Sequence, residues 1–335
     1  MNSFDLVRPA DPGAAVAAAA TAKADFQGVD VRFIAGGTTL VDLMKLGVEK
    51  PTRLVDVNRL PLAAIEATSD GGLRIGATAR NSDLANHPTV LRDYPVLAQA
   101  ILAGASAQLR NMATTAGNLL QRTRCMYFRD TAMRCNKRVP GSGCDAIDGA
   151  NRSLAILGTS PSCIATNPSD MCVALAALEA TVHVRGPNEE RDVAFADFHL
   201  LPGDTPHRET VVGAGDLVTS VTLPPPRQGS KQHYLKLRDR ASYEFALASA
   251  AVVIELDGEK IGRARLALGG VGTKPWRAPE AEAVLVGQQA DGVLFRKAAE
   301  AALKGAKPQS QNGFKIELAK RCIVHTLATA TGVAV

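Results

Sequence analysis

One stretch near the N-terminus, residues 32–47, constrains the fold of this chain more than any other. It reads RFIAGGTTLVDLMKLG: an apolar run, a glycine pair with two threonines, and a short amphipathic segment. Gly36 and Gly37 lack Cβ atoms, so their backbone can take positive φ and approach a ligand closely. The N–H groups of residues 38–40 would open the following helix and suit a diphosphate. We therefore predict a phosphate-binding loop, with a simple strand–turn–helix connection and a Thr N-cap as the structural alternative.

A dinucleotide-binding fingerprint of the Rossmann type is excluded by the glycine spacing. That fingerprint needs three glycines in the pattern G-x-G-x-x-G, for the turn, the close approach and the helix packing. Here Gly36 and Gly37 are adjacent, and no third glycine stands at the start of the helix. The run 54–57 contains Asp56, which only superficially resembles the ribose-binding acid of that fingerprint.

Three further motifs follow in order along the chain. They are QLRNMATTAGNLL at 108–120, IATNPSDM at 164–171 and YLKLRDR at 234–240. With the first loop, this set closely resembles the FAD-binding subunits of the molybdenum hydroxylases, the xanthine dehydrogenase and aldehyde oxidase family, over nearly the whole chain. The stretches 117–125 and 135–144 resemble, within that family, the flavin subunits of bacterial periplasmic aldehyde oxidoreductases.

The resemblance implies an α+β fold in two parts. Residues 1–225 would form the two-subdomain FAD-binding fold of the vanillyl-alcohol-oxidase (PCMH) type, with a cysteine-rich insertion at about 121–163. Residues 226–335 would form a C-terminal α+β domain with an antiparallel sheet and helices, like that of CO dehydrogenase flavoproteins. The prolines at 224–226 mark the boundary, because three prolines cannot continue a strand ladder.

Hydrophobic periodicity and turn residues predict the elements themselves. Strands are expected at 31–35, 54–57, 72–77, 181–185, 217–223, 233–238, 246–256 and 262–270, with an edge strand within 61–67. Helices are expected at 10–24, 39–46, 170–180, 279–286, 292–303 and 315–329, with further helical regions beginning near Ser82 and Pro95. Asp170 is the expected cap of its helix, and Asp257–Gly258 the expected hairpin turn.

Composition excludes several function classes. The chain has 335 residues, 46% of them hydrophobic, which is enough for about two globular domains. Its net charge of +5 comes from scattered Lys and Arg residues with only 4% aromatics, so we expect no nucleic-acid partner. No apolar run is long enough to insert into a membrane, and no signal peptide is visible. We expect either a cytoplasmic protein or, from the resemblance, a periplasmic one co-exported with a signal-bearing partner.

The cysteines are unevenly distributed. Four of the six fall within 39 positions: Cys125, Cys135, Cys144 and Cys163. The polar, glycine-rich residues between them have little to bury, so they need a cross-link or a metal to become ordered. Spacing alone leaves zinc and a [4Fe-4S] cluster equally open, with two disulfides behind. The resemblance implies a [4Fe-4S] cluster on these four, whereas Cys172 and Cys322 are expected in the core.

The resemblance also implies the FAD-binding residues. They are Ile34, Ala35, Gly36, Gly37, Thr38, Thr39, Leu40, Arg110, Thr114, Thr115, Gly117, Asn118, Ile164, Asp170 and Lys236. The first loop and residues 114–118 would hold the diphosphate and adenosine side, and Ile164 with Asp170 would flank the flavin half. Lys236 would lie near the flavin ring. Without the resemblance, Lys236 is the polar face of a strand.

Two cofactors, FAD and a [4Fe-4S] cluster, then imply an electron-transfer subunit. Its expected partners are a small subunit with two [2Fe-2S] clusters, a large molybdopterin subunit that oxidises aldehydes, and an external electron acceptor. No nucleophile or general base is evident in the chain, so we expect no catalytic residue of its own. Two alternatives are a stand-alone flavoenzyme of the vanillyl-alcohol-oxidase-like fold and a scaffold protein whose cysteines hold zinc.

Overall fold

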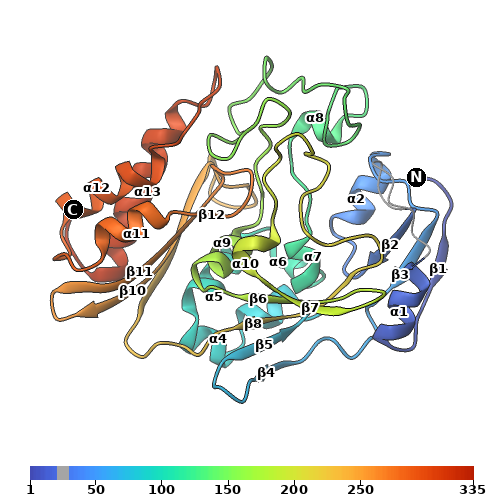
Figure 1. Ribbon diagram of the computed structural model, residues 1–335, viewed down its shortest axis with the longest axis horizontal. Helices are drawn as coiled ribbons and strands as arrows, with labels where there is room; N and C mark the ends of the chain where they lie inside the picture. Colours follow the sequence, from blue (N-terminus) through green and yellow to red (C-terminus); the bar gives the residue numbers. More distant parts are fainter. Residues whose placement is uncertain (21–29) are drawn as a thin grey trace.

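The computed structural model describes residues 1–20 and 30–335. The chain forms three sheets in a row, with the N-terminal sheet at one end of the molecule and the C-terminal domain at the other (Figure 1). The first sheet is parallel, in the order β1 (Asp5–Val7), β3 (Arg53–Asp56), β2 (Val31–Ile34). Helices α1 (Pro12–Ala19) and α2 (Leu40–Lys45) accompany this sheet.

Helix α1 begins as its sequence predicts. The Asp11 side chain accepts a hydrogen bond from the N–H of Ala14 at 2.8 Å, and Pro12 occupies the first turn, where its missing N–H costs nothing. The helix was expected over 10–24 but ends at Ala19. Residues 21–24 of that prediction lie outside the described part of the chain.

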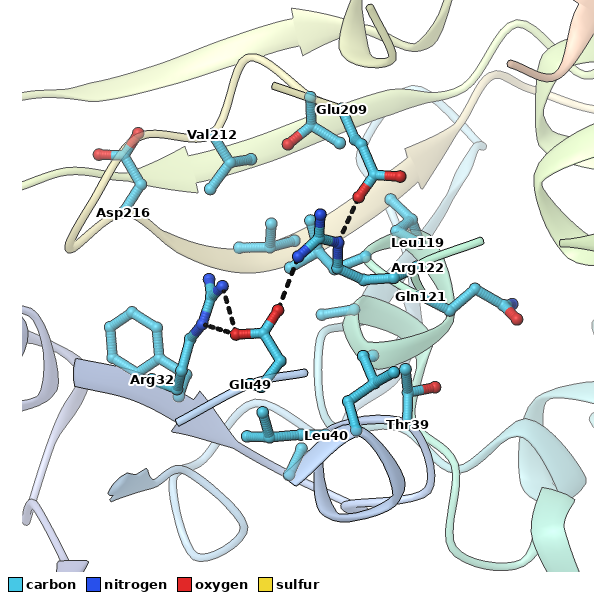
Figure 2. A pocket seen from close by; sticks show the side chains of 18 of the residues that line it. Arg32, Thr39, Leu40, Glu49, Leu119, Gln121, Arg122, Glu209, Val212 and Asp216 are labelled. Atoms are coloured by element: carbon cyan, nitrogen blue, oxygen red, sulfur yellow. Dashed lines mark hydrogen bonds and ion pairs between the residues drawn. The ribbon is translucent and has the colours of Figure 1, made fainter. Parts of the chain in front are cut away.

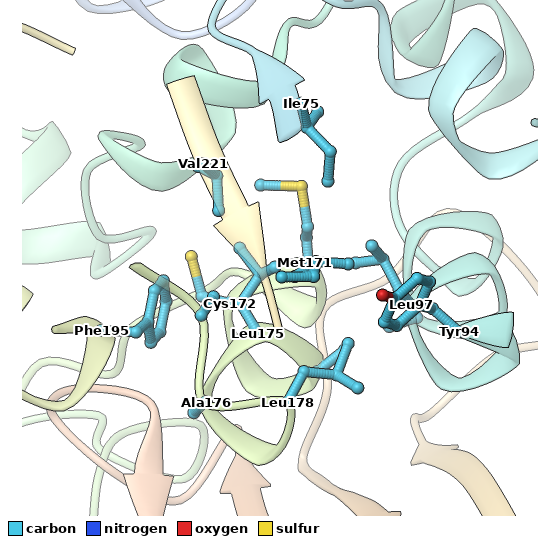
Figure 3. Packing of buried hydrophobic residues seen from close by; sticks show 14 of the residues in the cluster. Ile75, Tyr94, Leu97, Met171, Cys172, Leu175, Ala176, Leu178, Phe195 and Val221 are labelled. Atoms are coloured by element: carbon cyan, nitrogen blue, oxygen red, sulfur yellow. The ribbon is translucent and has the colours of Figure 1, made fainter. Parts of the chain in front are cut away.

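A five-stranded antiparallel sheet forms the middle of the molecule. Its order is β4 (Ile65–Ala67), β5 (Leu73–Gly76), β8 (Leu217–Leu223), β6 (Thr181–Arg185), β7 (Glu190–Ala194). Its helices are α3 (Asn81–Ala85), α4 (Pro88–Asp93), α5 (Pro95–Ala103), α6 (Ala107–Arg110), α7 (Thr115–Leu119), α9 (Asp170–Ala177) and α10 (Phe195–Phe198). All residues of α9 are buried, and Figure 3 shows Met171 of this helix among Ile75, Val221 and Leu97. Helix α9 is therefore the centre of the largest apolar core.

The cap of α9 differs from the prediction. Helix α9 begins at Asp170, but the capping side chain is Ser169, whose Oγ accepts from the N–H of Cys172 at 3.0 Å. Asp170 occupies the first helical position, and its carboxylate is held elsewhere by Tyr234 and Lys236. A serine is as good a cap as an aspartate, so the local sequence could not distinguish them.

The C-terminal domain is an antiparallel sheet covered by helices. Its sheet order is β12 (Trp276–Arg277), β11 (Lys260–Gly269), β10 (Ala248–Asp257), β9 (Lys231–Leu237). Helices α11 (Pro279–Leu285), α12 (Gly292–Leu303) and α13 (Phe314–Thr331) lie over one face (Figure 1) and enclose a separate core. Strands β10 and β11 join at Asp257–Lys260, where Gly258 has φ of +60°, so the expected hairpin is confirmed.

The cysteine segment, residues 121–163, contains one short helix, α8 (Met126–Arg129), and is otherwise irregular. It projects from the top of the molecule in Figure 1. Among residues 1–20 and 30–335, no helix is both long and apolar enough to cross a membrane.

Candidate functional site

A cavity of about 660 Å³ separates the N-terminal parallel sheet from the five-stranded sheet. Such a volume lies within the range of about 300–1,000 Å³ that is usual for ligand sites. The walls come from distant parts of the chain: residues 31–40, 119–123, 165–168, 207–210 and 212–218, with Thr114 and Gly117. Ligand contacts from this many segments can hold an extended molecule.

The predicted phosphate-binding loop, residues 35–40, forms one wall of this cavity. Gly37 has φ of +71°, a conformation that strongly favours glycine. The carbonyls of Gly37 and Thr39 accept helical hydrogen bonds from Val41 and Leu43. In the part of the chain that the structure describes, the N–H groups of residues 38–40 have no protein acceptor. Free N–H groups beside a cavity are an arrangement that binds phosphate.

The second loop, residues 112–117, lies directly against the first. A Cβ atom on Gly36 would stand 1.9 Å from the carbonyl oxygen of Met112. The sequence predicts a glycine here because the backbone must come close to a ligand. The structure adds a second reason, because the backbone of Gly36 packs against the second loop and leaves no room for a Cβ atom. Thr114 caps α7, and its Oγ1 accepts from the N–H of Gly117 at 3.2 Å. The structure thus brings the two threonine loops to one cavity.

Several predicted site residues do not line this cavity. Thr115 is buried and bonds the carbonyl of Ala79, and the Asn118 side chain accepts from Ser169 at 2.7 Å. Arg110 donates to the carbonyl of Gly104 at 2.7 Å. Ile164 lies in the small core that surrounds the cysteines.

Asp170 and Lys236 contact each other instead of the cavity. Lys236 Nζ lies 2.8 Å from Asp170 Oδ2 and 3.1 Å from the carbonyl of Ala103. The Tyr234 hydroxyl donates to Asp170 Oδ1 at 2.5 Å, and burial together with the Asp170 charge raises the pKa of Tyr234. We call Asp170, Tyr234 and Lys236 the Asp170 cluster. It connects α9 and the end of α5 to strand β9 of the C-terminal domain.

A chain of ion pairs crosses the cavity wall (Figure 2). Arg32 pairs with Glu49 at 2.8 Å, and Glu49 pairs with Arg122 at 2.7 Å. Arg122 pairs with Glu209 at 2.5 Å, and Glu209 pairs with Lys137 at 2.9 Å. We call these five residues the ionic chain. Its three cations exceed its two carboxylates by one positive charge, which suits an anionic ligand.

The pKa of Glu209 reflects its two partners. Burial raises this pKa, but the charges of Arg122 and Lys137 outweigh the burial and lower it to about 2. The pKa of Arg122 is raised, because Glu209 and Glu49 together outweigh its own burial. The sequence did not reveal the ionic chain. Arg32, Arg122 and Lys137 lie in stretches that the sequence singles out, but their carboxylate partners do not. Arg122 is 73 residues from Glu49 and 87 from Glu209.

His199 also lines the cavity. It is buried, and its Nε2 lies 3.2 Å from the carbonyl of Leu119. Burial lowers its pKa to about 4, so the imidazole is neutral near pH 7.

The four clustered cysteines come together at one side of the cavity. Cys125, Cys135 and Cys163 are buried in one small core with Cys144 at its edge, and Cys163 also lines the cavity. Cys135 and Cys144 face each other in an antiparallel bridge, and the N–H of Ala165 points at Cys163 Sγ at 3.5 Å. Burial raises the pKa of Cys125 to about 12. Such buried sulfurs need a positive centre to be stable as thiolates.

The geometry of these cysteines bears on the three expected cross-links. All four are free thiols, and so are the buried Cys172 and Cys322. No group of three or more His, Cys, Asp or Glu side chains among the described residues is arranged to hold a metal ion. Neither finding distinguishes zinc from a [4Fe-4S] cluster.

Comparison with protein families gives two matches that together cover most of the chain. Residues 2–226 match the FAD-binding domain in molybdopterin dehydrogenase, and residues 232–330 match the CO dehydrogenase flavoprotein C-terminal domain. The chain is 55% identical over 300 residues to the aldehyde oxidoreductase FAD-binding subunit PaoB of Escherichia coli, covering 89% of this chain and 91% of the relative.

Two further relatives are more distant. The chain is 30% identical over 283 residues to the glyceraldehyde dehydrogenase medium chain of Sulfolobus acidocaldarius, covering 84% of this chain and 83% of that protein. Its fold is similar to a chain of carbon monoxide dehydrogenase from Hydrogenophaga pseudoflava, with a TM-score of 0.77, 25% identity, and coverage of 99% of this chain and 98% of that one. The expected α+β fold, with a FAD-binding part and a CO-dehydrogenase-like C-terminal part, is confirmed.

Proposed function

Since the chain belongs to the molybdenum hydroxylase family, as a FAD-binding medium subunit, we propose that it is the electron-transfer subunit of an aldehyde oxidoreductase. The observation that carries the proposal is the cavity with its loop of free N–H groups. The aldehyde substrate rests on the similarity to the Escherichia coli subunit. When bound, FAD would accept electrons from iron–sulfur centres and pass them on, while the protein supplies binding and orientation.

The cavity fits the diphosphate half of FAD. Free N–H groups of residues 38–40, Gly37 in its left-handed conformation and the positive excess of the ionic chain all favour a diphosphate there. We assign the diphosphate and adenosine side to the two loops. Its residues are Ile34, Ala35, Gly36, Gly37, Thr38, Thr39, Leu40, Thr114, Thr115, Gly117 and Asn118. Arg110 is proposed as a further contact of this side, although its guanidinium donates to the carbonyl of Gly104 in this structure.

Ile164, Asp170 and Lys236 are proposed for the flavin half. The cavity wall continues to residues 165–168, next to Ile164 and two residues before Asp170. In this structure the charges of Asp170 and Lys236 neutralise each other, so a flavin contact requires one of them to turn from its partner. The assignment of these three residues rests on the resemblance to the family.

A [4Fe-4S] cluster is proposed on Cys125, Cys135, Cys144 and Cys163. Four free, mostly buried thiols gather in a segment that otherwise has little regular structure. Surrounding cations favour a negatively charged cluster, and Lys137 lies close enough to lower the pKa of Cys163, although burial raises it overall. We also propose that the two domains, residues 1–225 and 226–335, meet at the prolines 224–226.

The proposed partners are a small subunit with two [2Fe-2S] clusters, a large molybdopterin subunit and an external electron acceptor. Aldehyde oxidation is assigned to the large subunit, as the resemblance to the family implies. We place the complex in the periplasm, exported with a signal-bearing partner, with the cytoplasm as the alternative location.

A visible spectrum followed by an activity assay tests the proposal. The purified chain should show flavin bands together with broad iron–sulfur absorption, and iron near four atoms per chain. Mixed with benzaldehyde and an artificial one-electron acceptor, it should show no turnover until both partner subunits are added. Turnover by the chain alone, or bleaching of its flavin by the aldehyde, would favour the stand-alone flavoenzyme. Stoichiometric zinc without flavin would favour the scaffold protein.

A further inference from the structure

The cysteine segment contributes a buried cation to the FAD cavity. Lys137 follows Cys135 by two residues, is only 7% exposed, and lines the cavity. Its Nζ lies 2.9 Å from Glu209 Oε1 and 2.8 Å from the carbonyl of Pro206. Both acceptors belong to the stretch around residues 206–210 that forms the opposite wall. The position of this wall therefore depends on where the cysteine segment places Lys137.

The position of Lys137 depends in turn on the cysteines. The carbonyl of Cys135 accepts from the N–H groups of Arg138 and Val139, so a tight turn that contains Lys137 starts at Cys135. The side chain of Asn136, within this turn, donates to the carbonyl of Ser162 next to Cys163. Two further bonds hold the turn: the N–H of Cys135 donates to Ser142 Oγ, and the N–H of Gly143 donates to Asn136 Oδ1. These bonds connect the neighbours of Cys135, Cys144 and Cys163. A group that joins the four sulfurs would fix the turn and with it Lys137.

The ionic chain carries this placement across the cavity. Glu209 holds Arg122, Arg122 holds Glu49, and Glu49 holds Arg32 on strand β2, directly before the glycine loop. Glu49 is 3% exposed and cannot exchange its partners for water cheaply. If Lys137 moves away, Glu209 keeps only Arg122, and the wall that faces the two loops loses one of its three cations.

A second connection joins the cysteine segment to the glycine loop. Arg129 of α8, which begins directly after Cys125, forms two hydrogen bonds to the carboxylate of Asp42, at 2.7 and 3.1 Å. Asp42 belongs to α2, the helix that the glycine loop opens. The cysteine segment thus contacts both the cavity wall at Glu209 and helix α2.

We infer that the cysteine site and the FAD cavity are coupled through Lys137, so that a filled cysteine site increases the affinity for FAD. This inference rests on the proposed function, because it takes FAD and the iron–sulfur cluster as the two ligands. Coupling between two sites is reciprocal, and its usual size is about 5–150-fold in affinity. One lost cation in a chain of five charges places the expected effect near the lower end, about tenfold.

The experiment uses the full chain, with its iron either intact or removed anaerobically by a chelator, and titrates FAD by the quenching of its fluorescence. Removal of iron from the wild-type chain should raise the Kd for FAD about tenfold. Lys137→Met should raise the Kd to a similar extent with its iron intact, and removal of iron should then change it less than twofold. Lys137→Arg should restore most of the coupling.

Arg134→Met is the matched control. Arg134 lies in the same segment and pairs with Asp145, but it is exposed and does not line the cavity, so neither the Kd nor the coupling should change. A wild-type Kd unchanged by removal of iron would overturn the inference. The inference would also be overturned if removal of iron weakened FAD binding equally in the wild type and in Lys137→Met, because the coupling would then not depend on Lys137. Absence of FAD binding or of iron in the wild-type chain would instead contradict the proposed function itself.

Discussion

The ionic chain and the Asp170 cluster are built from the same kinds of residue, yet they differ in charge balance and in what they face. The ionic chain has one cation in excess and lines a cavity. The Asp170 cluster pairs one carboxylate with one ammonium, is at most 8% exposed, and joins α9 to strand β9. A neutral, fully bonded cluster connects two parts of the fold, whereas an extra cation beside a cavity attracts an anionic ligand.

The largest effect that this comparison predicts is on stability, at the Asp170 cluster. Lys236→Met leaves the Asp170 carboxylate buried with Tyr234 as its remaining partner. Breaking a buried pair in this way costs about 3–5 kcal/mol in the free energy of unfolding. Urea unfolding measures that loss.

The control for this prediction lies on the same strand. Lys231 of β9 is exposed, so Lys231→Met should change stability by less than about 0.5 kcal/mol. If Lys236→Met keeps the stability of the wild type, the Asp170 cluster does not stabilise the fold, and the proposed division between the two clusters is wrong.

The second prediction concerns acid and the ionic chain. The pKa of Glu209 in the folded protein is about 2, below its ordinary value of 4.5, so its carboxylate adds stability above about pH 4.5. That stability is lost as the pH falls from 4.5 towards 2, because the unfolded chain binds the proton first. Glu209→Gln should lose about 1.5–3 kcal/mol at pH 7, the usual range for bonds to charged groups, and less at pH 3. Urea unfolding at the two pH values tests the difference. An equal loss at both would show that the charge of Glu209 is unimportant.

The third prediction compares the two glycines of the first loop. Gly36→Ala should destabilise the protein by about 1–3 kcal/mol, since its Cβ would overlap the carbonyl of Met112 and push the second loop away. Gly37→Ala should cost about 1–2 kcal/mol, because an alanine is strained at φ of +71°. Only Gly36→Ala should displace the second loop, which protease cleavage within residues 112–117 can detect. Equal cleavage of both variants would contradict this contact.

The two loops could be predicted from the sequence because their chemistry is local. A glycine pair, two threonines and a helix define a turn with free N–H groups wherever they occur. The strands 181–185 and 217–223 were predicted with the observed bounds, since their apolar pattern and their turn residues agree. Local signals of this kind need no knowledge of the rest of the fold.

The contacts between loops could not be predicted, because they depend on segments that are far apart in sequence. No residue near Gly36 in the sequence indicates that Met112 will lie against it. Arg122 and Glu209 are 87 residues apart, and each looks like an ordinary surface charge in the sequence. The sheet orders, in which β8 lies between β5 and β6, are likewise a property of the whole chain. The ion pairs at the cavity can therefore be identified only in the folded structure.

The smallest expected effect is at Ser169, which directly precedes Asp170 in the chain. Its Oγ accepts from the N–H of Cys172 as the cap of α9 and donates to Asn118 on α7, beside the cavity. Loss of a serine cap costs about 1 kcal/mol, so Ser169→Ala should lower the free energy of unfolding by that amount, and Ser169→Thr, which keeps the hydroxyl, by less. Since Ser169 belongs to neither charged cluster, the affinity for FAD should change less than twofold in both variants. A much weaker affinity in Ser169→Ala alone would show that Asn118 must be held by Ser169 to bind the cofactor, and that the cap of α9 is part of the site.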